Sequence, residues 1–203
     1  PKTAEIIRKN GEWFISVSME YDTIERNCGT KAVGLDWGVS HYFSTIDQDG
    51  NFEQVENPRY LRNSKERLTS LQRDLALAKK GTRTQRKLKH QIAKLHQKIA
   101  RQRLDFTHKE TAKLVEVAAL IATEKLTVKN MTRSAKGTVE KNGKMVKQKA
   151  GLNREILNTA PAMTLNLLRY KAEEASSEFV EVPTKQVKPS QTCPDCGAKK
   201  KKS

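Results

Sequence analysis

The carboxylate of Asp36 stands at the end of a short apolar run and is followed closely by a glycine. Residues 32–45 read AVGLDWGVSHYFST, and the small and apolar side chains before Asp36 predict a buried strand. Gly38 allows the backbone to turn sharply or to approach a ligand. An ionised aspartate inside such a strand is costly unless its charge is compensated, and a divalent cation is the usual compensation. The pattern indicates a metal ligand, with a turn residue or strand cap as the alternative.

Glu124 repeats this arrangement in residues 119–128, which read ALIATEKLTV. The helical period of the preceding residues gives way there to a short apolar run that is typical of a strand. Two buried strands that each carry one acid can lie side by side in a sheet, and they then bring both carboxylates within reach of shared metal ions. An ion pair between Glu124 and Lys125 or a neighbouring arginine is the alternative.

Cys193 and Cys196 form a CPDCG knuckle that can present two thiolates to one zinc ion. Tetrahedral zinc needs two more ligands, and no second cysteine or histidine pair follows, so the pattern predicts a truncated zinc ribbon. A redox CxxC is the alternative, but it normally opens a helix, whereas Gly197 and the basic residues after it favour a ribbon turn. Cys28 makes the cysteine count odd, which favours a reducing compartment, and we expect a cytoplasmic, nucleoid-associated protein.

Three stretches of strand pattern come early in the chain. Asn10-Gly11 predicts a type I′ hairpin turn whose second strand, residues 13–20, is half-buried. Residues 21–31 are polar and indicate a linker. The strand that carries Asp36 is followed by a strand over 41–46, a turn at 47–50 and a strand over 51–56, which together predict an antiparallel meander.

From Tyr60 the apolar residues recur with a helical period. One stripe lies before Gly81 and a second lies after it, which predicts an antiparallel helical hairpin with a narrow apolar seam. Gly81 is the expected C′ residue of the first helix, and Thr82 or Thr84 the expected N-cap of the second. A helix over 155–175, with Pro161 in a first turn or at a break, and a strand over 179–182 complete the pattern. The stripes consist of Leu61, Leu68, Leu71, Leu75, Ala78, Leu88, Ile92, Leu95, Ile99 and Phe106.

The formal net charge of +16 is concentrated in particular stretches. Residues 1–58 carry a net charge of −5, residues 59–110 of +12, residues 111–184 of +4 and residues 185–203 of +5. Lysine and arginine at this density usually face a phosphate backbone, because each neutralised phosphate releases condensed counterions. A solvated coiled-coil surface usually mixes both signs, and the scarcity of aromatic side chains argues against an anionic membrane. The distribution predicts a nucleic-acid partner.

Four stretches in order resemble the successive motifs of the TnpB (OrfB) family, the transposon-encoded RNA-guided nucleases related to type V CRISPR effectors. They are GLDWG at 34–38, IATEKLTVKNM at 121–131, LLRYKAEEA at 167–175 and KPSQTCPDCG at 188–197. Trp37 departs from the pattern, because this family usually has a smaller aliphatic residue there. The resemblance runs from about Gly34 to the end of the chain, and the N-terminal hairpin resembles the last strands of the family's β-barrel wedge domain.

The resemblance implies an α/β fold, an RNase H-like (RuvC) mixed sheet with an inserted antiparallel helical hairpin and a truncated C-terminal zinc ribbon. Residues 1–30 would be wedge strands and linker, 31–188 the nuclease core and 189–203 the partial ribbon. The helical hairpin would occupy 59–118, and a basic loop 129–154 would be a lid beside the active site, with plain disorder as the alternative.

The resemblance also implies that Asp36 and Glu124 are catalytic acids on the first and fourth strands of this core. With a third acid they would hold two Mg²⁺ ions, and Cys193 and Cys196 would bind structural Zn²⁺. The third acid lies after the zinc ribbon in this family, and the chain begins without methionine, so we expect a fragment of reduced or no activity. The basic residues expected to bind guide RNA and target DNA are Arg59, Arg62, Lys65, Arg73, Lys79, Lys80, Arg83, Arg86, Lys87, Lys94, Arg101, Lys129 and Arg133.

Two function classes remain open at this point. One is a piece of an RNA-guided, divalent-metal-dependent DNA endonuclease. The other is a noncatalytic nucleic-acid-binding module or transposase accessory protein on the same fold. A transposase that catalyses strand transfer would share the carboxylate chemistry.

Overall fold

The structure is a computed structural model that describes residues 2–20, 28–138, 140–183, 192 and 198. The chain divides into two compact units, Pro1–Ile24 with Arg59–His108, and Glu25–Pro58 with Lys109–Ser203. The long helix α3 (Arg83–Val117) contributes residues to both units. Within the described residues, no helix has the length and apolar character that a bilayer crossing requires.

The first unit opens with a β-hairpin of β1 (Thr3–Lys9) and β2 (Glu12–Ser18). The pair is antiparallel with Lys9 opposite Glu12. Asn10 and Gly11 have φ angles of 53° and 85°, the positive values that a type I′ turn needs at both central positions. The predicted hairpin is therefore confirmed.

The prediction that the second strand of this hairpin is half-buried is wrong. Ile6 and Ile15 are paired and are 73% and 71% exposed, and Trp13 on the same face is 66% exposed. The opposite face carries Phe14, which is 38% exposed. The alternation of side chains is present, but neither face of this two-stranded sheet is closed.

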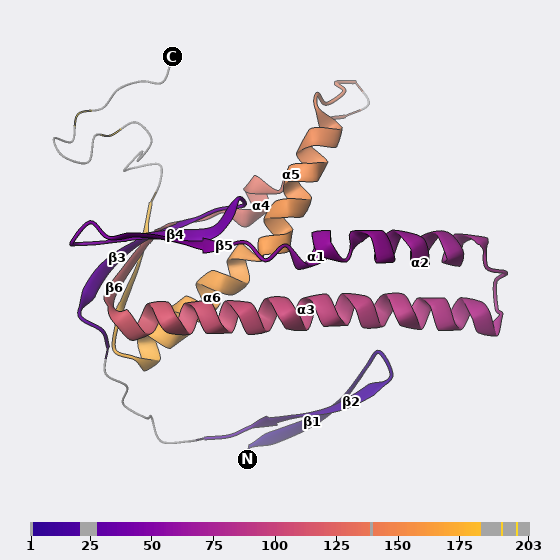
Figure 1. Ribbon diagram of the computed structural model, residues 1–203, viewed down its shortest axis with the longest axis horizontal. Coiled ribbons are helices and arrows are strands. Elements are labelled where there is room, and N and C mark those ends of the chain that lie inside the picture. The colour runs from indigo at the N-terminus through magenta and orange to yellow at the C-terminus, as the bar shows by residue number, and fades with distance from the viewer. Residues whose placement is uncertain (1, 21–27, 139, 184–191, 193–197, 199–203) are drawn as a thin grey trace. The chain divides into compact units, whose positions relative to one another are not determined.

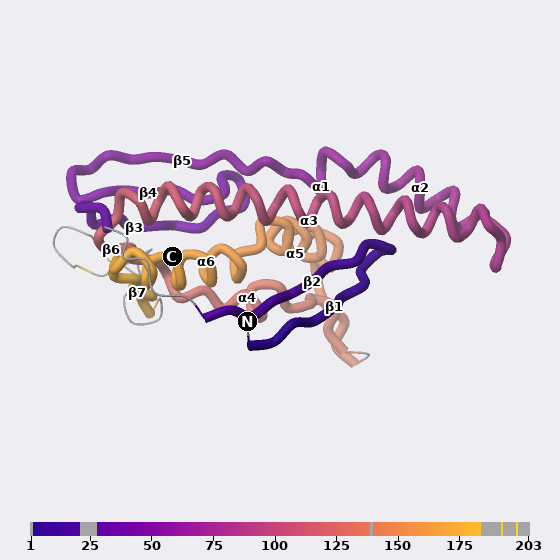
Figure 2. Tube along the Cα trace, turned by 90° about the horizontal axis from the view of Figure 1, so that it is seen from below, coloured from indigo at the N-terminus to yellow at the C-terminus, as the bar shows by residue number. Residues whose placement is uncertain are grey.

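Helices α1 (Tyr60–Asn63), α2 (Lys65–Leu77) and α3 form the rest of the first unit (Figures 1 and 2). Both views show α2 and α3 side by side. Helix α2 ends at Leu77, and its C-cap Ala78 has an extended backbone, so Gly81 lies in the loop with φ 80° and is not the C′ residue. The Thr82 hydroxyl accepts the N–H of Gln85 at 3.2 Å and caps α3, as one of the two expected N-caps.

A five-stranded mixed sheet is the centre of the second unit. Its strand order is β5 (Phe52–Glu56), β4 (His41–Asp47), β3 (Lys31–Trp37), β6 (Ala118–Glu124) and β7 (Glu178–Val182). The strands β3, β4 and β5 form the predicted antiparallel meander, and β6 pairs in parallel with both β3 and β7. A helical connection between β3 and β6 is what a parallel pair requires, and α3 is part of it.

One face of this sheet is covered by the end of α3 and by α6 (Pro161–Glu174). Leu114 of α3 is buried, and it lines a hollow of about 260 Å³ together with Val33 and Phe43 of the sheet. Leu168 of α6 is fully buried. The hydroxyls of Tyr42 and Thr164 share a buried hydrogen bond of 2.6 Å that joins β4 to α6.

Two further helices lie where a loop over residues 129–154 is predicted. They are α4 (Val128–Met131) and α5 (Val146–Thr159), so the loop prediction is wrong for both ends of this stretch. Ala160, with φ 49°, separates α5 from α6, and Pro161 stands in the first turn of α6. Pro161 thus marks both the predicted break and the predicted first turn.

Candidate metal and nucleic-acid site

The paired ends of β3 and β6 bring the two predicted acids together. Leu35 is the Cα partner of Thr123, and the same offset one residue further puts Asp36 beside Glu124. Neighbouring strands lie about 4.8 Å apart, and residues opposite each other project from the same face of a sheet. The side chains of Asp36 and Glu124 therefore leave the sheet on the same side.

This face carries a hollow of about 600 Å³. Asp36 and Glu124 line it, and Ser44 and Gln54, which share a hydrogen bond of 3.2 Å, add neutral polar groups. Its other lining side chains are small or apolar, so the two carboxylates are its charged groups. The complete lining is Gly34, Leu35, Asp36, Ser44, Thr45, Ile46, Phe52, Gln54, Ala122, Thr123, Glu124 and Val182.

The prediction that Asp36 is buried is wrong. Val33 and Leu35 point to the covered face and are each 5% exposed, whereas Asp36 points to the other face and is exposed. The strand follows a period of two, so folding does not require a cation to compensate this carboxylate. What supports a metal site is the geometry: two oxygen donors of the kind that Mg²⁺ prefers, with solvent access for its water ligands.

No third member of such a site is present among the residues that the structure describes. In that part of the chain, no group of three histidine, cysteine, aspartate or glutamate side chains could hold a metal ion together. The predicted zinc ligands Cys193 and Cys196 lie outside the described residues. Cys28 is exposed and is a free thiol.

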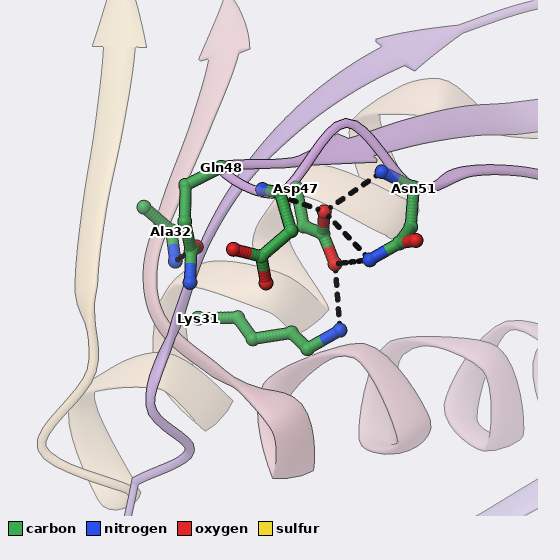
Figure 3. Close-up of polar contacts among 6 residues, drawn as sticks. Lys31, Ala32, Asp47, Gln48 and Asn51 are labelled. Atoms are coloured by element: carbon green, nitrogen blue, oxygen red, sulfur yellow. Dashed lines mark hydrogen bonds and ion pairs between the residues drawn. The ribbon is translucent and has the colours of Figure 1, made fainter.

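Asp47, at the end of β4, is a polar centre that the sequence analysis missed (Figure 3). Its carboxylate accepts Lys31 Nζ at 2.6 Å and Asn51 Nδ2 at 2.9 Å, together with the backbone N–H groups of Asp49 and Asn51. Lys31 and Asn51 hold the pKa of Asp47 well below its usual range, and the hydrogen bond with Asp47 raises the pKa of Lys31. The turn residues were the available signal, because an Asx side chain commonly bonds the backbone two residues on.

The same turn also fixes the beginning of β3. Gln48 N–H donates to the carbonyl of Ala32 at 3.1 Å, and the Ala32 N–H donates to Gln48 Oε1 at 2.6 Å. The backbone N–H and the side chain of Gln48 thus bond both backbone polar groups of Ala32. The turn after β4 therefore holds the first two residues of β3, Lys31 and Ala32, which precede Asp36 by five and four positions.

Helix α5 holds the segment that follows Glu124. Lys149 Nζ donates to the carbonyl of Met131 at 2.6 Å, and Asn153 Nδ2 donates to the carbonyl of Thr132 at 2.8 Å. Lys149 and Asn153 lie four residues apart and therefore on one face of α5. A helix as short as α4 is not stable alone, so these bonds to its last carbonyls keep it formed.

The predicted nucleic-acid ligands are exposed, with one exception. Arg59 is half-buried and has a left-handed backbone with φ 49° at the start of α1. Arg101 is exposed but bonds Glu12 Oε2 at 2.7 Å and lies over the ring of Phe14. Arg101, and then Gln97, lower the pKa of Glu12. These contacts attach the β1–β2 hairpin to α3 within the first unit, a role that the sequence analysis did not assign to Arg101.

Comparison with protein families and curated proteins gives consistent results. The family model OrfB_IS605, described as a probable transposase, matches residues 14–135. The chain is 34% identical over 197 residues to "Putative RNA-guided DNA endonuclease InsQ" of Escherichia coli (strain K12), covering 97% of this chain and 48% of that protein. It is 29% identical over 198 residues to "Putative RNA-guided DNA endonuclease" of Streptomyces pristinaespiralis, covering 97% and 44%. The chain spans about half the length of these relatives.

Two solved structures have a similar fold. A Cas12f1–sgRNA–target DNA complex matches 97% of this chain and 45% of its own with a TM-score of 0.50 and 18% identity. A CRISPR-Cas12f ternary complex matches 96% of this chain and 37% of its own with a TM-score of 0.53 and 17% identity. At these identities the likeness concerns the fold alone.

Proposed function

Because this chain belongs to the OrfB_IS605 family, to which TnpB belongs, we propose that it provides the nuclease core of an RNA-guided, divalent-metal-dependent DNA endonuclease. The observation that carries the proposal is that Asp36 and Glu124 end neighbouring parallel strands on one open face of the sheet. The five-stranded mixed sheet, with these acids on its first and fourth strands, supports an RNase H-like (RuvC) core.

In this proposal the carboxylate oxygens of Asp36 and Glu124 would hold two Mg²⁺ ions. When bound, Mg²⁺ would activate the attacking water and stabilise the leaving 3′ oxygen. Retaining both ions as the phosphate passes needs at least one more acid, which the resemblance puts after the zinc ribbon. Cys193 and Cys196 are two thiolate ligands suited to a structural Zn²⁺ in that ribbon.

In each of the two units, exposed basic side chains are proposed to bind guide RNA and target DNA: those of α2 and α3 in the first unit and those around α4 in the second. Exposed lysine and arginine bind phosphates regardless of base sequence, so they fit a protein in which base pairing with a guide selects the target. Lys129 and Arg133 follow Glu124 closely in the chain and are exposed. Of the basic residues expected to bind nucleic acid, these two are within ten positions of Glu124, a proposed catalytic acid.

The test is Mg²⁺-dependent nicking of single-stranded DNA by the protein expressed from its own gene, with Asp36→Ala and Glu124→Ala alongside. Each substitution removes a metal ligand, and the metal's share of transition-state stabilisation is several kcal/mol, so each rate should fall by at least about 100-fold. Asp49→Ala, which changes an exposed acid in the β4–β5 turn, is the control and should cut at the unsubstituted rate.

A noncatalytic nucleic-acid-binding protein is the second candidate. The exposure of Asp36 favours it, because a solvated carboxylate on an open strand face needs no metal ion. Nicking that is equal in the unsubstituted protein and both alanine variants and no greater than without protein, together with unchanged DNA binding, would favour this second function over the first.

A further inference from the structure

The placement of Asp36 beside Glu124 depends on a one-residue shift at the start of β6. Lys31 is the Cα partner of Ala118, but Ala32 is the partner of Leu120. Strand β6 therefore contains one extra residue, Ala119, at this point, as in a β-bulge. If the first offset continued along the strands, Asp36 would be paired with Thr123. Glu124 would then project from the covered face, because a slip of one residue reverses the direction of every side chain.

The shifted segment is held by the hydroxyl of Ser177. Ser177 Oγ donates a hydrogen bond of 2.7 Å to the carbonyl oxygen of Ala118, the residue just before the extra one. Ser177 is 8% exposed and Ala118 is fully buried, so water does not replace this bond. A buried carbonyl without a partner is unfavourable, so the hydroxyl favours the backbone arrangement that presents this oxygen to it.

Ser177 is itself fixed by the end of α6. Its N–H donates to the carbonyl of Ala172 at 2.8 Å, and the Ser176 N–H donates to the carbonyl of Glu173 at 3.2 Å. Ser176 has a left-handed backbone with φ 57°. These are the two hydrogen bonds and the left-handed residue of a Schellman motif. Because Ala172 is fully buried against the sheet, the Ser177 hydroxyl has a defined position relative to β6.

The backbone of Gly29 packs against the same junction. A Cβ atom at Gly29 would lie 1.9 Å from the carbonyl carbon of Val117 and 2.5 Å from the nitrogen of Ala118. The backbone at Gly29 is therefore in direct contact with Val117, the last residue of α3, and with Ala118, the first residue of β6. Ala118 is thus contacted by the backbone at Gly29 as well as by Ser177.

We propose that Ser177 is a positioning residue, which sets the register of β6 so that Glu124 lies on the same face as Asp36. The catalytic meaning of this role rests on the proposed function, whereas the register itself does not. Ser177 contacts neither carboxylate and acts through the backbone of Ala118.

The experiment compares Ser177→Ala and Ser177→Thr in the full chain by two measurements. Backbone nuclear Overhauser effects between β3 and β6 give the register without metal or nucleic acid. Electron paramagnetic resonance of Mn²⁺ measures the affinity of the proposed metal site. The binding that is lost in Asp36→Asn is the binding that belongs to this site. Thr159→Val is the matched control, since it deletes another buried hydroxyl that donates to a backbone carbonyl, at 2.9 Å, within α5.

We expect Ser177→Ala to lose the contacts that pair Leu35 with Thr123 and to bind Mn²⁺ about 10-fold more weakly or worse, as loss of a supporting contact around a metal site does. Ser177→Thr keeps the hydroxyl and should restore both, and Thr159→Val should change neither. Unchanged contacts and Mn²⁺ affinity in Ser177→Ala would overturn the proposal.

Two other results are also decisive. If Ser177→Ala does not fold, Ser177→Cys, which keeps a weak donor, is judged by the same two measurements. If the unsubstituted chain binds no Mn²⁺ through Asp36, the proposed function fails, and the interstrand contacts alone then support or overturn the register claim.

Discussion

At the scale of single residues, Asp47 makes stability depend on pH. Its hydrogen bonds with Lys31 and Asn51 lower its pKa in the folded chain, whereas an unfolded aspartate has a pKa of about 3.9. The bonds therefore contribute stability that is fully present above about pH 4 and is lost as the pH falls further. We expect Asp47→Asn to lower the melting temperature at pH 7 and to make the decrease of melting temperature between pH 4 and pH 2 smaller.

The control for this prediction is Asp49→Asn. Asp49 lies in the same turn and is exposed, so its side chain should leave both the melting temperature at pH 7 and its acid dependence close to those of the unsubstituted chain. Identical melting temperatures of Asp47→Asn and the unsubstituted chain at pH 7, measured by circular dichroism, would contradict the structural role of this carboxylate.

At the scale of elements, the junction between α3 and β6 should not accept a side chain at Gly29. A Cβ there would overlap the Val117 carbonyl, and the backbone would have to move. We expect Gly29→Ala to destabilise the chain by about 1–3 kcal/mol, the cost of overpacking a filled site. The measurement is urea unfolding followed by circular dichroism.

Gly151→Ala is the matched control for Gly29→Ala. Gly151 lies inside α5, and nothing comes within 4 Å of a Cβ placed there. Alanine should therefore stabilise the chain by about 0.5–1 kcal/mol through its higher helix propensity. If both alanine variants unfolded at the same urea concentration, the close approach at Gly29 would not be real.

The connection between α5 and α6 contains a left-handed alanine. Ala160 has φ 49°, a conformation that costs a non-glycine residue about 1–2 kcal/mol. Glycine adopts this conformation without the steric cost, but it loses more conformational entropy than alanine when the chain folds. We therefore expect Ala160→Gly to stabilise the chain by about 0.5–1 kcal/mol, less than the full steric cost. Ala162→Gly, at an exposed position within α6, should destabilise it by a similar amount, and equal losses in both variants would refute the assignment.

Some elements of the fold follow from the sequence and others do not, for physical reasons. The Asn10-Gly11 turn and the meander were predictable, because both depend on local turn chemistry and side-chain alternation. The register of β6 was not, because it depends on Ser177, a residue more than 50 positions away. The helix predicted over 155–175 includes the end of α5, but residues 146–154 were predicted to be a loop because they are polar, and two of their polar side chains, Lys149 and Asn153, bond backbone carbonyls at the end of α4.

The prediction that Asp36 is buried was wrong for a different reason. Val33 and Leu35 alternate with Gly34 and Asp36, so the period-two signal of a strand with one open face was present in the sequence. The apolar run suggested a strand buried on both faces, in which the acid would need a cation. The alternation within β3 puts Asp36 on the open face, and the argument from burial overlooked it; that Glu124 lies on the same face depends on the register of β6.

At the scale of the whole molecule, the net charge of +16 predicts that the proposed nucleic-acid binding depends strongly on salt. The binding constant should fall linearly with salt on logarithmic axes, and each phosphate contact to duplex DNA contributes about 0.9 to the slope. Net charge alone, however, does not say which side chains make these contacts. Variants that remove equal charge from different places can separate the two effects.

The informative pair of variants removes three positive charges each. One replaces Lys79, Lys80 and Arg83, which are exposed around the α2–α3 loop, with glutamine. The other replaces Lys2, Lys113 and Arg169, which are paired with Glu20, Glu110 and Glu181. We expect the first variant to lower the salt slope by up to about 2.7, and the second to lower it much less, because its cations are already neutralised by acids.

Fluorescence anisotropy with a labelled duplex at several salt concentrations measures both slopes. An equal decrease in the two variants would mean that binding follows net charge, and the predicted contacts at the α2–α3 loop would be wrong. A decrease confined to the first variant would assign phosphate contacts to this loop. The loss should be the same for unrelated DNA sequences, because phosphate contacts carry no base information.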